Sequence, residues 1–378
     1  MASQSNPFPV QGQCDPRFEG VRAAFTANLE RGAEVGASVA ITLDGESVVD
    51  LWGGARDAAR TLPWEADTIT WVASTTKTAL AMSALLLADR GELDVEAPVA
   101  RYWPQFKAKD VLVRHCLGHT AGLPGWDAPI AFEDIADWEK LTGLLAGQTP
   151  WWEPGTASGY HGLTQGYLVG EVIRRITGQS VGTFFAREIA GPLGVDFHIG
   201  LADEHHHRVA QSVPPAIPET PVGGPGSIAM RIHDNPPLPR ERFGEAWFRR
   251  CEVPAGNGFG NARAVARFNA LLACEGELGG RRLMSRDGAR RALYQQSDGP
   301  DLAFIAPVRF ALGYALSLAG MNFDGHEVCF WGGSGGSLIV VDFDRRMTLA
   351  YVMNKLEGSP FGDPRNSAIL RATYQALA

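Results

Sequence analysis

The stretch WVASTTKTALAMSALLLADRG, residues Trp71 to Gly91, contains the feature on which the fold assignment depends. Its apolar run predicts a helix that begins near Ser74 and ends at Gly91, a residue type that often terminates helices. Ser74 and Lys77 are three residues apart, so on a helix their side chains lie on the same face. Such a pair is a candidate nucleophile with its base, because burial lowers the pKa of a lysine amine.

The same four residues also have a simpler structural interpretation. In it Ser74 caps the helix and Lys77 extends its ammonium group to solvent. However, no other serine in the chain is followed by a lysine three residues later. Residues elsewhere in the chain must therefore decide between the two interpretations.

Composition limits the classes of partner. The chain has 378 residues, of which 45% are hydrophobic and 20% are charged, so it can bury a large core. A net charge of -8 with interspersed signs argues against nucleic-acid and anionic-membrane partners. Five dispersed cysteines without a C-x-x-C pattern predict reduced thiols, and no apolar run reaches the ~20 residues of a membrane span. With no basic and apolar leader visible, we expect a cytoplasmic protein that acts on small neutral molecules.

The order of patterns along the chain predicts an α+β fold. A helical pattern near residues 18–29 precedes two β-rich runs around Asp44-Gly45, which is a hairpin signal. Helical patterns dominate to about residue 250, and β-rich runs with a final helix follow. We expect an antiparallel sheet flanked by helices, formed by residues 1–80 and 255–378, and a mainly helical second domain at 81–254, with the active site between them.

A second serine motif has to be weighed against Ser74. Residues 332–336 spell G-x-S-x-G around Ser334, the pattern of a nucleophile elbow. An elbow needs a following helix and a later histidine, but β-rich runs follow Ser334 and the last histidine is His326. A triad with the histidine before the serine stays open. We expect a glycine-rich close approach of the backbone here instead of a nucleophile.

Three ordered elements carry a resemblance to a known family. They are Ser74-Thr75-Thr76-Lys77, then PGTASGYHG with Tyr160, and then Trp331-Gly332-Gly333. With VRHCLGHTAGLPGW between the first two, they resemble the serine β-lactamase and penicillin-recognising superfamily. Within it, the chain is most similar to the family VIII carboxylesterases, which share the class C β-lactamase fold. The likeness runs from about residue 15 to the C-terminus.

The resemblance implies roles for individual residues. Ser74 would attack the substrate carbonyl, and Lys77 and Tyr160 would handle the protons, with the first acceptor of the two left open. The residue directly after the third element, Ser334, would lie on an edge strand. Its backbone N–H and that of Ser74 would form the oxyanion hole. Neither a metal nor an organic cofactor is implied.

Departures from the penicillin-recognising pattern indicate the substrate class. Trp331 stands where those relatives have the lysine of K-T-G, and Gly162 stands where they have the asparagine of Y-x-N. Both changes weaken the case for a β-lactam substrate, and a tryptophan offers an apolar wall for a neutral group. The residues we expect to contact substrate are Trp331, Gly332, Gly333, His161, Trp152 and Trp126. Simple packing is an equal alternative for the last two, and holding the loop of Tyr160 is the alternative for His161.

Other histidines have structural interpretations. The run His205 to His207 cannot direct three rings at one ion from a regular element, so we expect a solvated loop. His115 and His119 lack the glutamate of H-E-x-x-H and are expected to make structural hydrogen bonds.

The sequence therefore predicts a serine carboxylesterase for small to medium esters or lactones, with small molecules as its only partners and no oligomeric state assigned. The alternatives are β-lactam or D-amino peptide hydrolysis and acyl transfer through the same acyl-enzyme. A non-catalytic ligand-binding relative of penicillin-binding proteins is the alternative from another class.

Overall fold

The computed structural model describes residues 7–215, 223–318, 321, 326–357 and 363–378. The strands of its main sheet are β1 (Gln11–Cys14), β2 (Gly36–Leu43), β3 (Glu46–Gly54), β9 (Ser297–Asp301), β10 (Ala306–Phe310), β11 (Ala315–Leu316), β12 (Val328–Gly332), β13 (Leu338–Asp342) and β14 (Met347–Met353). Within the described residues these nine strands pair in the order β1-β3-β2-β14-β13-β12-β11-β10-β9. All neighbours are antiparallel.

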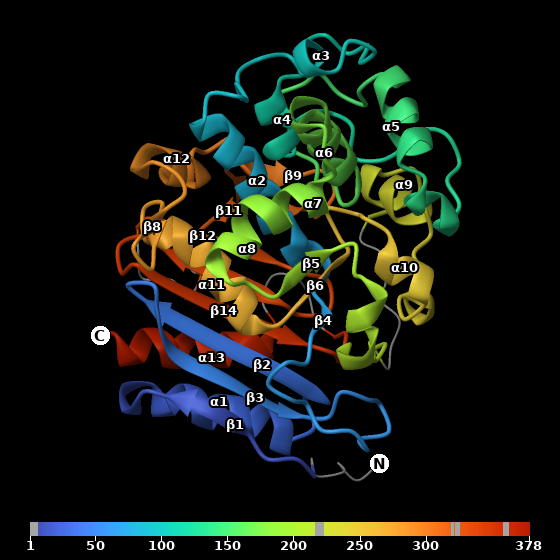
Figure 1. Cartoon of the computed structure of the whole chain (residues 1–378). Helices are drawn as coiled ribbons and strands as arrows, with labels where there is room; N and C mark the ends of the chain where they lie inside the picture. The colour runs from blue at the N-terminus through green and yellow to red at the C-terminus, as the bar shows by residue number, and fades with distance from the viewer. Residues whose placement is uncertain (1–6, 216–222, 319–320, 322–325, 358–362) are drawn as a thin grey trace.

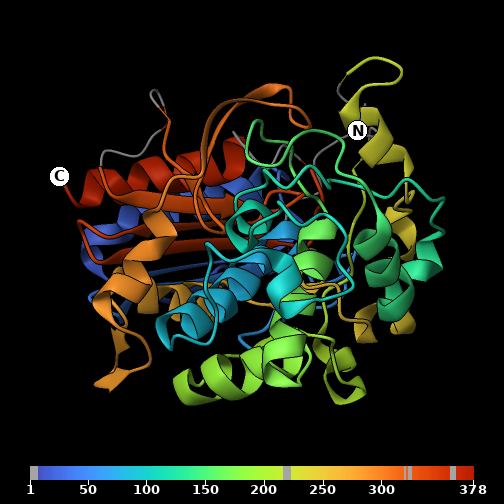
Figure 2. The ribbon, with the colours of Figure 1, turned by 90° about the horizontal axis from the view of Figure 1, so that it is seen from above.

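Strand β2 pairs with strands from both ends of the chain. It forms the expected hairpin with β3, and Asp44 (φ 49°) and Gly45 (φ 81°) in the turn take the left-handed backbone that a tight hairpin requires. Its other edge pairs with β14, from Ala37 opposite Met353 to Leu43 opposite Met347. Figure 2 shows the strands from both chain ends, blue and red, within one sheet.

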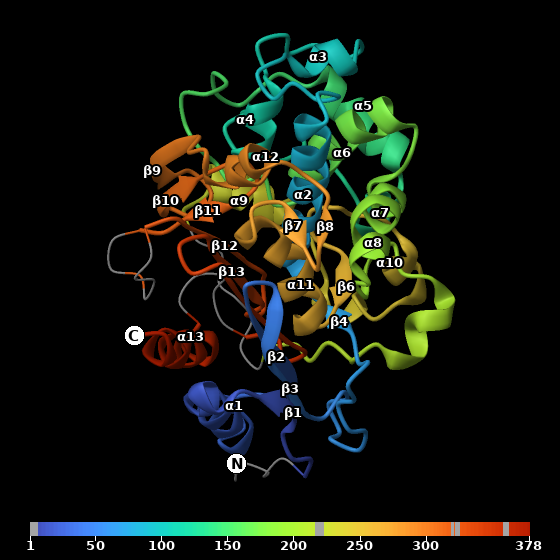
Figure 3. The ribbon, with the colours of Figure 1, turned by 60° about the vertical axis from the view of Figure 1, so that its left-hand side comes forward.

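Helices cover both faces of this sheet. On one face, α1 (Glu19–Glu30) packs beside α13 (Pro364–Ala376), as Figure 3 shows. On the other face, α11 (Ala262–Ala273) lies against β2, β13 and β14. Behind it runs α2 (Lys77–Asp89), whose residues from Lys77 to Ala88 are all buried (Figure 1). A helix that is apolar on all sides packs in the interior of a protein, and α2 is accordingly the buried central helix of the fold.

The remaining elements surround α2 and the sheet. The helices are α3 (Val99–Tyr102), α4 (Val113–Leu117), α5 (Trp138–Gly147), α6 (Thr164–Thr177), α7 (Val181–Phe185), α8 (Gly191–Leu193), α9 (Ile228–Asp234), α10 (Ala246–Arg250) and α12 (Arg286–Arg290). The 3-10 turns are η1 (Pro16–Phe18), η2 (Ala73–Thr76), η3 (Phe132–Ala136), η5 (Asp203–Arg208), η6 (Arg240–Arg242) and η7 (Arg291–Leu293), and η4 (Ala186–Ala190) is a π-helical turn. A small sheet pairs β4 (Thr70–Trp71), β6 (Gly258–Gly260) and β5 (Phe197–Ile199), and β7 (Glu277–Leu278) pairs with β8 (Arg281–Arg282).

The predicted α+β class, with an antiparallel sheet flanked by helices, is confirmed. The division into 1–80 with 255–378 and a helical unit at 81–254 stays a prediction. In the part of the chain that the structure describes, no helix combines the length and apolarity that crossing a membrane requires.

Candidate active site

Ser74 lies in a tight turn directly before the central helix. The sequence predicts an α-helix from about Ser74, but residues 73–76 form the 3-10 turn η2 and the α-helix begins at Lys77. Ala73 has a φ of 48°, a left-handed backbone that costs a non-glycine residue on the order of 1–3 kcal/mol. The turn is held by Thr76, whose hydroxyl donates to the Ala73 carbonyl and accepts from the Gly258 N–H of β6 at 2.7 Å.

Lys77 approaches Ser74 from the first turn of α2. Its Nζ lies 3.4 Å from Ser74 Oγ and donates to the carbonyls of Gly162 and Ala255, each at 2.7 Å. Only 1% of the lysine is exposed, and this burial holds its pKa well below its usual range. Burial thus favours the neutral amine, the form that can accept a proton.

Tyr160 reaches the same serine from the loop before α6. Its hydroxyl donates to Ser74 Oγ at 2.6 Å, and Lys77 Nζ lies 4.8 Å from the ring centre. The ring stacks on Phe304 at 4.6 Å and meets the edge of His119 at 5.0 Å. Burial raises the pKa of the phenol, and the hydrogen bond to Ser74 opposes this only in part. The structure thus brings the three residues predicted by their spacing and order to one point.

The loop after β12 packs directly on the turn that carries Ser74. Gly333 leaves no room for a side chain, because a Cβ there would lie 2.5 Å from the Val72 carbonyl oxygen. Ser337 Oγ donates to that same oxygen at 2.8 Å and contacts Thr75 Oγ1 at 2.9 Å. Ser334 is therefore held beside the turn that carries Ser74.

The expectation that Ser334 lies on an edge strand is wrong, because the strand before it, β12, lies inside the sheet between β13 and β11. Ser334 comes after the end of β12, in the turn before β13, and its hydroxyl accepts from Arg240 at 2.7 Å. The following glycines are fixed from α13: Arg365 donates to the Gly335 carbonyl, and Asn366 donates to the Gly336 carbonyl at 3.1 Å.

Trp331 does not form the pocket wall that its position in the motif suggests. Its side chain is 2% exposed, and its ring packs 5.6 Å from Tyr160 and stacks on His119 at 5.7 Å. Side chains alternate between the faces of a strand, and Trp331 faces the packed interior behind the tyrosine. Gly332 and Gly333 are also buried, so this element supports Tyr160 and the loop after it.

The three other expected contact residues differ in placement. Trp126 lines the cavity beside Ser74 and donates from Nε1 to the Leu141 carbonyl at 3.1 Å. His161 is fully buried away from that cavity, with Nδ1 on the Gly159 carbonyl and Nε2 accepting from the Leu123 N–H. Trp152 is not part of the lining either, because its ring packs over Gly159. Only Trp126 is therefore placed to touch a substrate there.

The remaining histidines make structural contacts. His115 Nδ1 accepts from the Leu112 N–H, and His119 Nδ1 accepts from the His161 N–H. His205 to His207 lie in the 3-10 turn η5. No group of three or more metal-ligating side chains occurs among the described residues.

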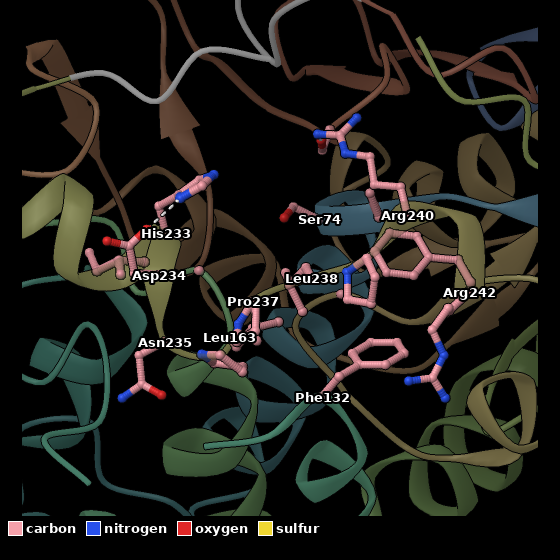
Figure 4. Close-up of a pocket in the computed structure, with 18 of the residues that line it drawn as sticks. Ser74, Phe132, Leu163, His233, Asp234, Asn235, Pro237, Leu238, Arg240 and Arg242 are labelled. Atoms are coloured by element: carbon pink, nitrogen blue, oxygen red, sulfur yellow. Dashed lines mark hydrogen bonds and ion pairs between the residues drawn. The ribbon is translucent and has the colours of Figure 1, made fainter. Parts of the chain in front are cut away.

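A cavity of about 1030 Å³ opens beside Ser74, Tyr160 and Ser334 (Figure 4). One wall is the continuous segment 232–243, IHDNPPLPRERF, all of whose residues line the cavity. We call this segment the strap. Sequence reasoning missed it, because its prolines indicate only a loop, and missed Asp301, which bonds the Tyr160 backbone, because a lone aspartate carries no signal.

Comparisons with known proteins identify the family of the chain. Residues 21–374 match the Beta-lactamase family. The chain is 35% identical over 368 residues to the esterase/β-lactamase LipL of Mycobacterium tuberculosis, covering 92% of this chain and 83% of that protein. It is similar to a crystal structure of a family VIII carboxylesterase, with 38% identity, a TM-score of 0.92 and coverage of 97% of this chain and 100% of the other. A penicillin-binding protein homologue from Caulobacter crescentus is 36% identical with a TM-score of 0.90, over 97% of this chain and 100% of that one.

The serine-lysine pair, the tyrosine above it and the glycine-rich loop thus occur in a chain that matches one family over nearly its whole length, and this protein belongs to the β-lactamase family.

Proposed function

We propose that the protein is a serine carboxylesterase that hydrolyses neutral esters through an acyl-enzyme on Ser74. The observation that carries the proposal is the convergence of Tyr160 Oη, at 2.6 Å, and Lys77 Nζ, at 3.4 Å, on Ser74 Oγ beside an open cavity. Relatives named as esterases, one of them 38% identical, support an ester as the substrate. Trp331 also stands where the penicillin-recognising relatives have a lysine, and the loss of that cation favours a neutral substrate over a β-lactam carboxylate.

We propose Lys77 as the first proton acceptor, because its burial favours the neutral amine. A neutral amine has two N–H groups and one lone pair, and the carbonyls of Gly162 and Ala255 take both N–H groups. The lone pair is then left for the Ser74 hydroxyl, which itself accepts from Tyr160. In this arrangement each of the three side chains has a partner, and serine is already aligned to lose its proton to lysine.

The chemical steps follow from this arrangement. Ser74 Oγ bonds to the ester carbonyl carbon while Lys77 takes the hydroxyl proton, and the backbone N–H groups of Ser74 and Ser334 hold the oxyanion. Tyr160 gives its proton to the departing alkoxide and regains one from the Lys77 ammonium. Water then attacks the acyl-enzyme, loses its proton to the same pair and releases the acid with restored Ser74.

Hydrolysis of β-lactams is the second candidate, since the M. tuberculosis relative carries both names. The test of the main proposal combines a p-nitrophenyl butyrate assay with a serine-directed phosphonate. We expect a burst of p-nitrophenol and, by mass spectrometry, a phosphonate adduct on Ser74. A protein with neither burst nor adduct would be a ligand-binding relative, and an adduct on Ser334 would restore the nucleophile elbow. Turnover of nitrocefin at a rate above that of the ester would favour the β-lactamase.

The pH dependence should report the protonation of Lys77. Burial depresses the pKa of this amine, and a protonated lysine cannot take the serine proton, so kcat/KM should rise with pH through the lysine pKa and then level off. Burial lowers the pKa of His161 to about 3, lowers that of His119 and raises that of Tyr160. These shifts all favour the neutral forms, and the charged group that faces Tyr160 is the Asp301 carboxylate. A kcat/KM that falls between about pH 6 and 9 would contradict a neutral-lysine base.

A further inference from the structure

The cavity is much larger than the reaction centre. Its volume of about 1030 Å³ lies at the upper end of pockets that enclose drug-sized ligands. Ser74, Tyr160 and Ser334 occupy one part of the lining, and the rest extends past Leu163 toward the strap. A short ester bound at Ser74 would leave most of this space filled with water.

One part of the cavity lining is aromatic. Phe132 and Phe243 line it with ring centres 6.0 Å apart, and Trp71 meets Phe243 at 4.8 Å. Each of these rings is at most 7% exposed, so the packing around them fixes the wall before any ligand arrives. Trp126 extends the same surface.

The strap, which ends at Phe243, supplies a further part of the lining. Pro236, Pro237 and Pro239 fix its backbone, since the ring of proline locks φ. Leu238 between them is 43% exposed, one of five large apolar side chains exposed among the described residues. Figure 4 shows Leu238 and Pro237 lying toward Leu163 and Phe132.

Most of the charged residues of the strap bond to other protein groups, and Arg240, which donates to Ser334 Oγ at 2.7 Å, places a cation at the Ser334 end of the cavity. Arg242 donates to Glu245 at 2.7 Å and pairs with Glu133, and His233 contacts Asp234 at 3.0 Å. These pairs satisfy one another, so they do not call for a charged ligand. A large apolar group is what this space would bind best, because it covers Leu238 and displaces poorly bonded water.

We propose that Trp126, Phe132, Leu163, Leu238 and Phe243 form an apolar subsite for one large apolar substituent of the ester. This inference rests on the proposed function, and it changes the expected substrates from small and medium esters to bulky ones. The substituent is the acyl chain or the alcohol, and the two arms of the experiment distinguish them.

The experiment measures kcat/KM in two series. One series varies the acyl chain of p-nitrophenyl esters from acetate to decanoate, and the other varies the alcohol of acetate esters from methyl to naphthyl. We expect kcat/KM to rise in one series by up to about fourfold per buried methylene group. Leu238→Asp should reduce the ratio of kcat/KM for the largest over the smallest substrate by about tenfold or more. The matched control is Leu62→Asp, which changes an exposed leucine outside the cavity lining and should leave the ratio unchanged.

The outcomes separate the subsite from the proposed function. Flat kcat/KM in both series, with p-nitrophenyl acetate hydrolysed, would overturn the subsite and leave the esterase standing. If no ester is hydrolysed, the esterase fails and binding of 1-decanol, read from tryptophan fluorescence, decides on the subsite. Quenching that Leu238→Asp weakens would support it, and no quenching would overturn it.

A separate observation concerns the turn from Asp301 to Ile305, which links β9 to β10. This turn touches the loop that carries Tyr160: Leu302 N–H donates to the Ser158 carbonyl at 2.9 Å, and Tyr160 N–H donates to Asp301 Oδ1 at 3.2 Å. The same carboxylate oxygen accepts from the Phe304 N–H at 2.8 Å, and the Phe304 ring stacks on Tyr160. Asp301 Oδ1 thus holds the Tyr160 backbone directly, and by holding Phe304 it also fixes the ring that stacks on one face of the tyrosine.

Asp301 is 1% exposed, and no donor among the described residues reaches its Oδ2. A buried acceptor left without a partner is unfavourable, so its retention calls for a role. We propose that Asp301 is a positioning residue that holds Tyr160 with its hydroxyl on Ser74 Oγ, a role that rests on the proposed function. Its negative charge adds to burial in raising the phenol pKa, which keeps the proton that Tyr160 must donate.

The test compares Asp301→Ala with Asp301→Asn, which keeps an oxygen acceptor in place. We expect the alanine variant to lose about tenfold or more in kcat and in the rate of phosphonate labelling at Ser74, with KM changed less than about twofold, and the asparagine variant to keep most of both. Asp298→Ala, an exposed aspartate on the same strand, is the control. Equal losses in the alanine and asparagine variants, or a loss carried by KM alone, would overturn the role. An unlabelled wild type would instead count against the proposed function.

Discussion

Ser74→Ala is expected to lower kcat for p-nitrophenyl butyrate by about ten-thousand-fold or more and to prevent formation of the acyl-enzyme. The substitution removes the oxygen on which both Tyr160 and Lys77 converge, so Lys77 loses the hydroxyl that it would deprotonate and Tyr160 loses its acceptor. The fold should survive, because the turn is held by Thr76 and Ser337 and not by the Ser74 hydroxyl. Steady-state kinetics and the circular dichroism melting curve measure the two effects.

Ser334→Ala is the matched control for this variant. It keeps the backbone N–H that we propose for the oxyanion hole and removes a hydroxyl that accepts from Arg240. Most of the activity should therefore remain. A loss as large as that of Ser74→Ala would point to Ser334 as the nucleophile, and an active Ser74→Ala enzyme would exclude the proposed mechanism.

Lys77→Met is expected to lower kcat by about a hundredfold to ten-thousand-fold with a smaller change in KM. Methionine fills similar space in the buried first turn of α2 but has no lone pair that can take the serine proton. The carbonyls of Gly162 and Ala255 also lose their donor, which costs about 1–3 kcal/mol each unless water replaces it. Kinetics and thermal unfolding separate the two consequences.

The control for this variant is Lys107→Met, which removes the charge of an exposed lysine far along the chain from the motif. It should match the wild type in both measurements. If Lys77→Met kept its kcat within tenfold of the wild type, the first proton would have to go to Tyr160 or to water.

The sequence predicts the structure best where residues close together in the chain determine it. Ser74 and Lys77 are placed by local helical spacing, and their side chains meet although the serine lies in a 3-10 turn. The hairpin at Asp44-Gly45 is likewise local, because those residue types favour the left-handed backbone that the turn requires. The position of Tyr160 follows only from the order of the family's motifs.

Features that depend on distant pairing were not predictable in this way. Which face Trp331 presents depends on the register of β12, and the sequence does not show that β9 to β11 continue the sheet beyond it. The short strands Ser297–Asp301 and Ala306–Phe310 contain prolines and polar residues, so their alternation is weak. Asp301 and the strap come to the site from segments far from Ser74 in the chain, and local sequence patterns do not predict such long-range contacts.

The pairing of β2 with β14 also sets when the enzyme can exist during its synthesis. Ser74 leaves the ribosome about 270 residues before Met347 begins the strand that completes the sheet, and Arg365, which fixes the Gly335 carbonyl, is made later still. At about 5–20 residues per second this interval lasts roughly 15 to 55 seconds. The nascent chain therefore carries the proposed nucleophile through most of translation without the loop that we propose for the oxyanion hole, so we expect hydrolysis to start only after the last strand and Arg365 have been made.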